Sequence, residues 1–318
     1  MVTVFFMRTP FIASAPGKLM LFGEHAVIYG HPCIVTALNV RLTVTVEESH
    51  ERDIIIDAPG VSDTRFISAA VKRVKKRLKN ILPGLTIRTK SEFSSQYGFG
   101  SSSAVTVATI YALCGFSNMK ASLQDIFEMA YQTVLDVQGT GSGFDVAAAV
   151  AGGTLLYGNS GKIFNKIPIN TIPLIVGYTG IKADTISLMS SVSKKRELFP
   201  EKMDRIFIAI EKIVQEAKER IIERDWERTG RLMNFNHEYL RDLGVSSEKL
   251  ERLISSTKNA GAWGAKLSGA GDGDCMIAIA PESKKDAVKN AIQEAGGKVI
   301  DILSGAEGVR TEHREVVV

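Results

Sequence analysis

Three glycine-rich stretches divide this chain, and each lies where a helix or a strand is about to begin. They read GFGSSS at 98–103, GTGSGFD at 139–145 and SGAGDGDC at 268–275. Because glycine has no Cβ, the backbone of such a loop can approach an anion closely. The amides at the start of a following helix also direct the positive end of the helix dipole toward that anion. Together, the three loops favour a site for a phosphorylated ligand more strongly than one loop would.

The segments between these loops predict strands and helices in mixed order. Alternating β-branched residues within 11–57 predict strands, with a turn at Pro16-Gly17, and 64–80 has the apolar spacing of a helix. Further helices are predicted over 104–116, 121–137, two stretches of about 200–243, and 284–296, and further strands over 85–93, 174–180, 276–280 and 298–303. This mixture indicates an α+β or two-domain α/β enzyme, which a change of composition near 165–175 divides into domains 1–170 and 171–318.

Composition and charge argue against several other classes of protein. The net charge is only +4, and the densest basic run, KRVKKRLK at 72–79, is interspersed with apolar residues, as on the solvated face of a helix. We therefore expect no nucleic-acid partner. No apolar stretch approaches the roughly 20 residues of a membrane span, so we expect no membrane partner either. Three dispersed cysteines, Cys33, Cys114 and Cys275, argue against a disulfide framework or zinc site and indicate the cytoplasm.

The first of the three loops has the form of a phosphate cradle, in which glycines precede Ser101, Ser102, Ser103 and an apolar helix. Its serines can cap the helix, donate to a phosphate or bind Mg²⁺. The alternative is a simple helix cap with glycines for close packing, and the loop alone does not separate the two. It has neither the GxxxxGK[ST] pattern of a P-loop nor the third glycine of GxGxxG, which removes the main support for hydride transfer.

A few charged residues stand in small or apolar surroundings. Asp145 is either an early helix residue or a base that accepts the proton of a substrate hydroxyl. Lys18 is either solvated or functional, and the polar pair Glu24-His25 lies in an apolar stretch where it needs partners. The two aspartates of the third loop oppose an anionic ligand by like charge, and a tight helix-to-strand connection is the alternative reading of that loop.

Taken together and in order, three segments resemble the motifs of the GHMP kinase superfamily of small-molecule kinases. They are APGKLMLFGEHAVIYG at 15–30, GFGSSSAVTVA at 98–108 and KLSGAGDGDC at 266–275. The first is most similar to mevalonate kinases, whereas YGFGSSSAVTVA, GSGFDVAAAV and the GDC of the third look more like phosphomevalonate kinases. The resemblance spans most of the chain.

This resemblance implies two domains with the active site between them. The N-terminal domain would contain a left-handed βαβ crossover and bind ATP, and the C-terminal domain would have a ferredoxin-like sheet. The implied activity is transfer of the γ-phosphate of ATP, with Mg²⁺, to the 5-hydroxyl of mevalonate in isoprenoid precursor biosynthesis. The alternatives are a phosphomevalonate kinase, a sugar kinase or a decarboxylase of the same family. A homodimer of this chain is among the expected assemblies.

Residue by residue, the resemblance assigns three groups of site residues. Asp145 is the catalytic base, and Lys18 lies near the transferring phosphate. The nucleotide phosphates contact Gly98, Gly100, Ser101, Ser102 and Ser103, with Ser102 as the Mg²⁺ ligand. The substrate contacts Glu24, His25, Thr185, Gly269, Ala270 and Gly271.

Two departures from the family pattern affect these assignments. Mevalonate kinases place a Mg²⁺-binding glutamate eleven residues before the catalytic aspartate, where this chain has Val134, and Asp136 is a candidate substitute. The third loop has Asp272 where glycine is usual, and a carboxylate there disfavours a phosphorylated substrate. We therefore favour mevalonate over phosphomevalonate.

Overall fold

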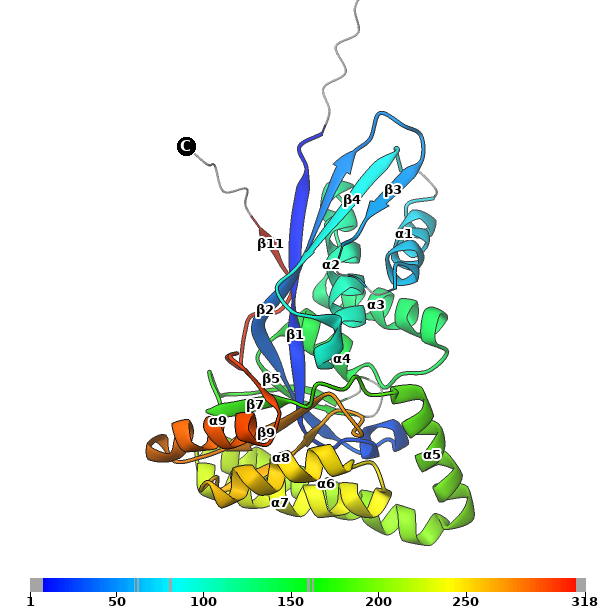
Figure 1. The fold of residues 1–318 in the computed structure, drawn as a ribbon. Helices are drawn as coiled ribbons and strands as arrows, with labels where there is room; N and C mark the ends of the chain where they lie inside the picture. Colours follow the sequence, from blue (N-terminus) through cyan, green and yellow to red (C-terminus); the bar gives the residue numbers. More distant parts are fainter. Residues whose placement is uncertain are drawn as a thin grey trace, which may run out of the picture.

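Two β-sheets organise the protein in the computed structural model, which describes residues 8–59, 61, 63–79, 82–158, 161 and 163–312 (Figure 1). Within that part of the chain, the first sheet contains seven strands and the second contains four. The first consists of β1 (Phe11–Phe22), β2 (Cys33–Glu48), β3 (Ile54–Asp57), β4 (Leu85–Ser91), β5 (Thr154–Gly158), β6 (Ile163–Ile167) and β11 (Arg310–Glu312). The second consists of β7 (Leu174–Tyr178), β8 (Gly264–Ser268), β9 (Cys275–Ile279) and β10 (Lys298–Ile300).

The first sheet is built around β2, a long strand that pairs with β1, β4 and β5. The strand order is β11-β1-β2-β4-β3, and β6 extends the sheet beyond β5. β3 and β4 run parallel and are joined through α1 (Arg65–Arg77), which forms a βαβ unit. The register of β1 on β2 shifts between Pro16 and Lys18, so the predicted Pro16-Gly17 turn is instead an irregularity within one strand. Such bulges re-aim side chains, here that of Lys18.

Helices pack on the first sheet as their apolar patterns predict. α2 (Ser101–Phe116) lies against β1 and β2, with α1, α3 (Leu123–Gln138) and α4 (Phe144–Ala151) around it. Because α2 is enclosed by sheet and helices, most of its residues are buried. α1 turns Phe66, Ile67, Val71 and Val74 inward, and its basic residues lie toward solvent. Most of the basic run therefore lies on the outward face of an amphipathic helix.

The second sheet has the order β10-β7-β9-β8, and all neighbouring strands are antiparallel. This is the ferredoxin-like arrangement that was expected. The helices of this half are α5 (Thr185–Leu198), α6 (Pro200–Ile222), α7 (Trp226–Leu243), α8 (Glu248–Asn259) and α9 (Lys285–Glu294). α7 and α8 pack on β8 and β9, and α9 packs on β7 and β10. None of the described helices is both long and apolar enough to cross a membrane.

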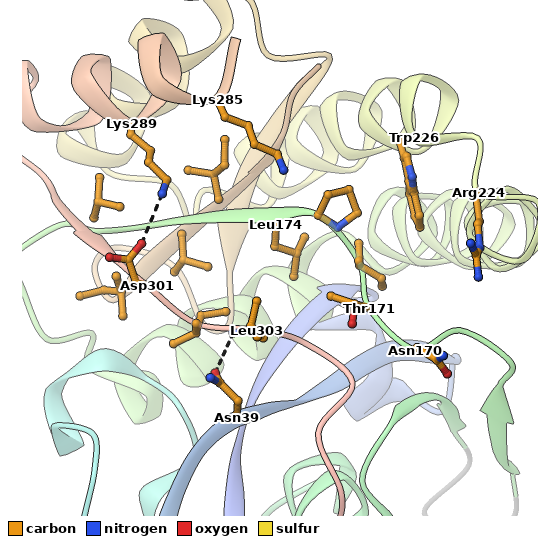
Figure 2. A pocket seen from close by; sticks show the side chains of 17 residues that line it. Asn39, Asn170, Thr171, Leu174, Arg224, Trp226, Lys285, Lys289, Asp301 and Leu303 are labelled. Carbon is orange, nitrogen blue, oxygen red and sulfur yellow. Dashed lines mark hydrogen bonds and ion pairs between the residues drawn. The ribbon is translucent and has the colours of Figure 1, made fainter. Parts of the chain in front are cut away.

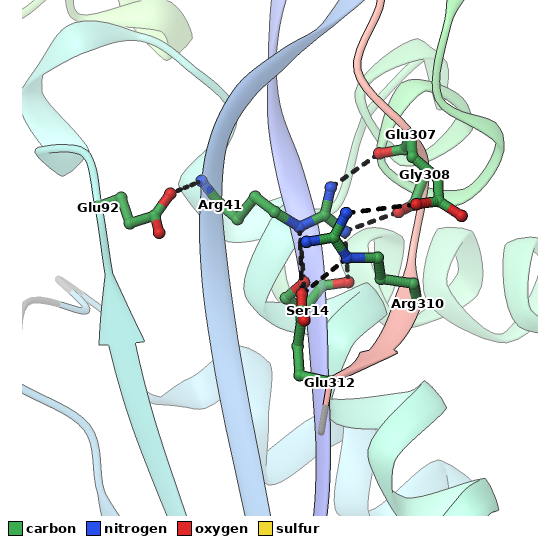
Figure 3. Close-up of polar contacts among 7 residues, drawn as sticks. All are labelled: Ser14, Arg41, Glu92, Glu307, Gly308, Arg310 and Glu312. Carbon is green, nitrogen blue, oxygen red and sulfur yellow. Dashed lines mark hydrogen bonds and ion pairs between the residues drawn. The ribbon is translucent and has the colours of Figure 1, made fainter. Parts of the chain in front are cut away.

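The chain passes twice between the sheets, from β6 to β7 and from β10 to β11. The predicted division at residue 170 falls in the first connection, and β11 returns to pair with β1. Buried Arg41 holds this returning segment (Figure 3). Its guanidinium donates to Ser14 Oγ and O and to the carbonyls of Glu307 and Gly308, at 2.6 to 3.0 Å. Burial lowers the pKa of Arg41 to about 10, so the group stays charged at neutral pH.

We predict that Arg41→Met lowers the free energy of unfolding by about 2–4 kcal/mol, because buried acceptors on β1 and the returning segment lose their donor. Urea unfolding followed by circular dichroism measures this. Arg88→Met is the matched control, since it removes an exposed ion pair with Glu47 in the same sheet and should cost less than about 1 kcal/mol. Equal losses in the two variants would contradict the role given to Arg41.

Candidate active site

Lys18 brings together three segments that are far apart in the sequence. Its Nζ lies 3.0 Å from Asp145 Oδ1 and donates to the carbonyl of Gly98 at 3.1 Å. The backbone amide of Lys18 donates to Phe99 O at 2.9 Å, because the bulge in β1 turns this part of the strand toward the second motif. The ring of Phe144 lies 5.2 Å from the ammonium group. The predicted base, the predicted cation and the glycine-serine loop therefore share one site.

The glycine-serine loop leads into the first turn of α2, whose backbone amides are free to bind an anion. Gly98 and Gly100 have φ values of 72° and 74°, which glycine adopts without strain. α2 begins at Ser101, and its first turn contains no acidic residue. Ala104 N donates to Gly100 O, so the amides of residues 101–103 precede the first helical hydrogen bond. These amides and the serine hydroxyls suit the phosphates of ATP.

The third glycine loop joins β8 to β9, so it connects two antiparallel strands and not a helix to a strand. It packs directly on the second motif, because a Cβ on Gly98 would lie 2.5 Å from Asp274 Oδ2. Asp274 is buried, lies 3.2 Å from Lys182 Nζ and accepts from Ala183 N at 3.0 Å. Its charge is thus balanced within the protein. The expectation that both aspartates of this loop oppose an anion has to be restricted to Asp272, which is exposed.

Glu24 and His25, predicted to line the substrate, both bind the third loop. Glu24 forms a fully buried ion pair with Lys266 of β8, the strand that leads into this loop. His25 Nε2 donates to Ala270 O at 2.8 Å. The contacts of these two side chains therefore help to position the loop that contains Gly269, Ala270 and Gly271.

Burial controls the protonation of these groups. It lowers the pKa of His25, so the ring is neutral, and the bond to Ala270 O places the single proton on Nε2. His25 Nδ1 is then a buried acceptor with no protein partner among the described residues. Burial also raises the pKa of Glu24 and lowers that of Lys266, while their mutual attraction opposes both shifts. Glu24 Oε2 is likewise without a partner in the described chain, which leaves two free acceptors beside the loop.

Lys266 was not among the predicted site residues. It belongs to the third motif, and its side chain is completely buried although lysine seldom is. The available signal was the charge pattern: Lys266 is the basic residue of the apolar segment AKLS, and Glu24 is the acidic residue of the apolar segment around it. Neither segment alone indicates that the two meet.

Two further predicted residues lie at the edge of this arrangement. Thr185 is exposed at the first position of α5, where Asp184 caps the helix through Ser187 N. Its segment is tied to the third loop by Ala183, which donates to Asp274. Ser102 lies in the first turn of α2 and is half-buried.

Asp136, the candidate for the missing metal ligand, has another partner in the structure. Asp136 is exposed on α3 and forms an ion pair with Arg73 of α1, and Val134 is buried in the core. In the part of the chain that the structure describes, no three His, Cys, Asp or Glu residues are grouped to hold a metal. Mg²⁺ commonly binds through one or two protein ligands together with substrate phosphates, a mode in which Ser102 can be the single protein ligand.

Comparison with known proteins agrees with this arrangement. Two family profiles match, GHMP kinases N terminal domain over residues 65–153 and GHMP kinases C terminal over 211–298, and a galactokinase galactose-binding signature matches residues 3–48. The mevalonate kinases of Thermococcus gammatolerans and Pyrococcus furiosus are 36% and 37% identical, each over 95% of this chain and 98% of the relative. The crystal structure of L. major mevalonate kinase in complex with R-mevalonate has a TM-score of 0.82 at 28% identity, covering 96% of this chain and 98% of that one.

The fold and these full-length matches define a small-molecule phosphotransferase, and the chain belongs to the GHMP kinase family. Within that family, the relatives named above place it with the mevalonate kinases. The resemblance predicted from three short motifs is therefore confirmed, as is the two-sheet fold that it implied.

We predict that Lys266→Met lowers the free energy of unfolding by about 3–5 kcal/mol, because Glu24 is left as an unpaired buried charge. Adding Glu24→Gln should recover part of the loss, since the double variant has no buried charge at this position. Urea unfolding measures both. The control Arg205→Met breaks an exposed pair with Glu201 and should change stability by less than about 1 kcal/mol. A Lys266→Met protein as stable as the wild type would contradict the importance of the pair.

Proposed function

We propose that this protein transfers the γ-phosphate of ATP to the 5-hydroxyl of mevalonate. The observation that carries the proposal is the position of Lys18, whose ammonium group lies between the carbonyl of Gly98 and the carboxylate of Asp145. A cation at this point is suited to the charge of a transferring phosphoryl group, and the carboxylate beside it is suited to a substrate hydroxyl.

The choice of mevalonate rests on two observations. The relatives that match along almost their whole length are mevalonate kinases. In addition, Asp272 is exposed on the third loop, so a substrate that already carries a phosphate would meet a like charge there. The galactokinase signature over residues 3–48 covers the first motif, and galactose therefore belongs among the substrates to be tested.

The mechanism is direct transfer without a covalent enzyme intermediate. The amides at the start of α2 and the hydroxyls of Ser101, Ser102 and Ser103 bind the phosphates of ATP. Asp145 orients the substrate hydroxyl and accepts its proton, while the hydroxyl oxygen bonds to the γ-phosphorus and the bond to the β–γ bridging oxygen breaks. Lys18 stabilises the negative charge on the phosphoryl group. Mg²⁺, held by Ser102 together with the phosphates, would supply further charge neutralisation.

The state of the cysteines supports a cytoplasmic enzyme. Cys33, Cys114 and Cys275 are buried and unpaired. Burial raises the pKa of all three thiols, to about 12 for Cys114, so they remain protonated and unreactive. Such cysteines need no oxidising compartment.

Measurement of ADP release with mevalonate, phosphomevalonate, galactose and homoserine tests the proposed function. We expect turnover with mevalonate to exceed turnover with each of the others by at least about a hundredfold in kcat/KM, a difference of nearly 3 kcal/mol in transition-state binding. If phosphomevalonate or galactose is turned over faster than mevalonate, mevalonate is not the substrate. Tight binding of ATP without turnover of any of the four would identify a nucleotide-binding sensor.

We predict that Asp145→Asn lowers kcat by at least about a hundredfold, because the group that accepts the hydroxyl proton is lost. Binding of ATP, measured by calorimetry, should stay within a few-fold of the wild type. Asp136→Asn is the matched control, since Asp136 is exposed and paired with Arg73, and it should leave kcat unchanged. Near-normal turnover of the Asp145→Asn variant would show that Asp145 is not the catalytic base.

A further inference from the structure

Tyr97 lies directly before the glycine-serine loop and was not among the predicted site residues. It is the last residue of the short helix η2 (Ser95–Tyr97). Its ring lies between two other aromatic rings, with its centroid 5.5 Å from that of Phe99 in the loop and 5.0 Å from that of Tyr178 at the end of β7. Both pairs meet edge to face, an arrangement that aromatic rings prefer. Tyr97 therefore joins the loop to the second sheet.

The partners of Tyr97 on the second sheet belong to one row that crosses three strands. Lys298 of β10 lies opposite Tyr178 of β7, and Tyr178 lies opposite Cys275 of β9. Lys298 Nζ donates to the Tyr97 hydroxyl at 3.1 Å, and Cys275 Sγ donates to the Tyr97 carbonyl at 3.3 Å. Residues directly opposite one another on neighbouring strands have their side chains on the same face of the sheet. The three residues thus form one surface on which Tyr97 packs.

The same row also contacts the first motif. Ser268 of β8 lies opposite Cys275, and its hydroxyl donates to Met20 O at 2.7 Å. The third glycine loop connects Ser268 to Cys275, so it starts and ends in this row. We call the four residues the end row of the second sheet: Lys298, Tyr178, Cys275 and Ser268. All three glycine-containing segments that resemble family motifs therefore meet at the end row.

The covalent connections between the sheets lie at the other end of these strands. The chain enters β7 at Leu174 and continues beyond β10 to Leu303, whose backbone amide donates to Asn39 at 2.7 Å (Figure 2). The end row is thus a separate, non-covalent contact between the sheets. Because the chain does not cross there, the packing of side chains has to hold the glycine-serine loop against the second sheet.

The backbone next to Tyr97 needs such support. Gly98 and Gly100 have positive φ values, and glycine loses more conformational entropy than other residues when its backbone is fixed. The buried ring of Phe99, between them, contacts the ring of Phe93 at 6.1 Å, just beyond the end of β4. The side chains of Phe99 and Tyr97 therefore hold the loop from two directions, one toward each sheet.

We propose that Tyr97 is a positioning residue for ATP, because its packing on the end row fixes the loop whose amides receive the phosphates. This inference rests on the proposed kinase function. Without the Tyr97 ring, the loop keeps its contact with the first sheet through Phe99 and loses its contact with the second. ATP then binds only the fraction of molecules in which the amides are aligned, and its apparent affinity falls by that fraction.

Calorimetric titration of the full chain with ATP and Mg²⁺ tests this role. We expect Tyr97→Ala to weaken ATP binding at least about tenfold. Tyr97→Phe keeps the ring and loses only a bond to an exposed lysine, so its affinity should stay within about threefold of the wild type. The matched control is Tyr111→Ala, which removes a half-buried tyrosine of α2 that contacts Phe11 and should leave ATP affinity unchanged. Wild-type affinity in Tyr97→Ala, or an equal loss in Tyr111→Ala, would overturn the proposal.

Steady-state kinetics distinguish positioning of the loop from a general loss of structure. In Tyr97→Ala the KM for ATP should rise at least about tenfold, while the KM for mevalonate stays within about threefold, since the predicted mevalonate contacts lie in other segments. An equal rise in both KM values would overturn the proposal. The wild-type chain reports on the proposed function separately: ATP binding without turnover of any candidate substrate contradicts the kinase activity and leaves the calorimetric test of Tyr97 intact.

A substitution on the second sheet keeps the test valid if Tyr97→Ala fails to fold. Tyr178→Leu removes the ring against which Tyr97 packs and retains an apolar side chain at a buried position. We expect it to weaken ATP binding at least about fivefold, and the double variant to bind at most about twofold more weakly than Tyr97→Ala, because both changes remove the same contact. Unchanged ATP affinity in Tyr178→Leu, or losses that multiply in the double variant, would overturn the proposal.

Discussion

The buried ion pair between Glu24 and Lys266 determines where the third glycine loop lies, and the candidate site depends on that position. Removing two charges from water costs several kcal/mol per ion, so the pair persists only when each charge has its partner in place. Lys266 also donates to Leu267 O, and Ser268 donates to Met20 O at 2.7 Å. A strand of the second sheet is thereby fixed to the first motif at two nearby positions, Lys266 and Ser268.

The site also shows how a loop with carboxylates can border a phosphate. Asp274 is buried, but Lys182 and the amide of Ala183 satisfy it, and its side chain fills the space that a Cβ on Gly98 would need. Asp274 therefore separates the two glycine loops. Its charge is already compensated within the protein, without a ligand. Asp272 has no such partner among the described residues and remains the carboxylate that can discriminate against a second phosphate on the substrate.

Sequence patterns could predict the elements whose burial is periodic, but not those that depend on distant partners. The amphipathic α6 and α7 were predicted for this reason, and α2 was predicted because its sequence is apolar throughout. α5 was missed because Val192 is the one residue of that helix with a buried side chain, so no apolar stripe exists to detect. β11 has three residues and becomes a strand only by pairing with β1. Lys266 was missed for a similar reason, since its partner lies 242 positions away.

The returning segment explains why motion between the two sheets would concentrate at one place. From Leu303 onward it is held to the first sheet by Asn39, by the two hydrogen bonds that Arg41 donates to Glu307 O and Gly308 O, and by the pairing of β11. Before Ile300 the chain belongs to the second sheet through the pairing of β10 with β7. The few residues between these anchors, together with those that precede β7, must absorb any change in the relation of the sheets. Hinges are short segments of this kind.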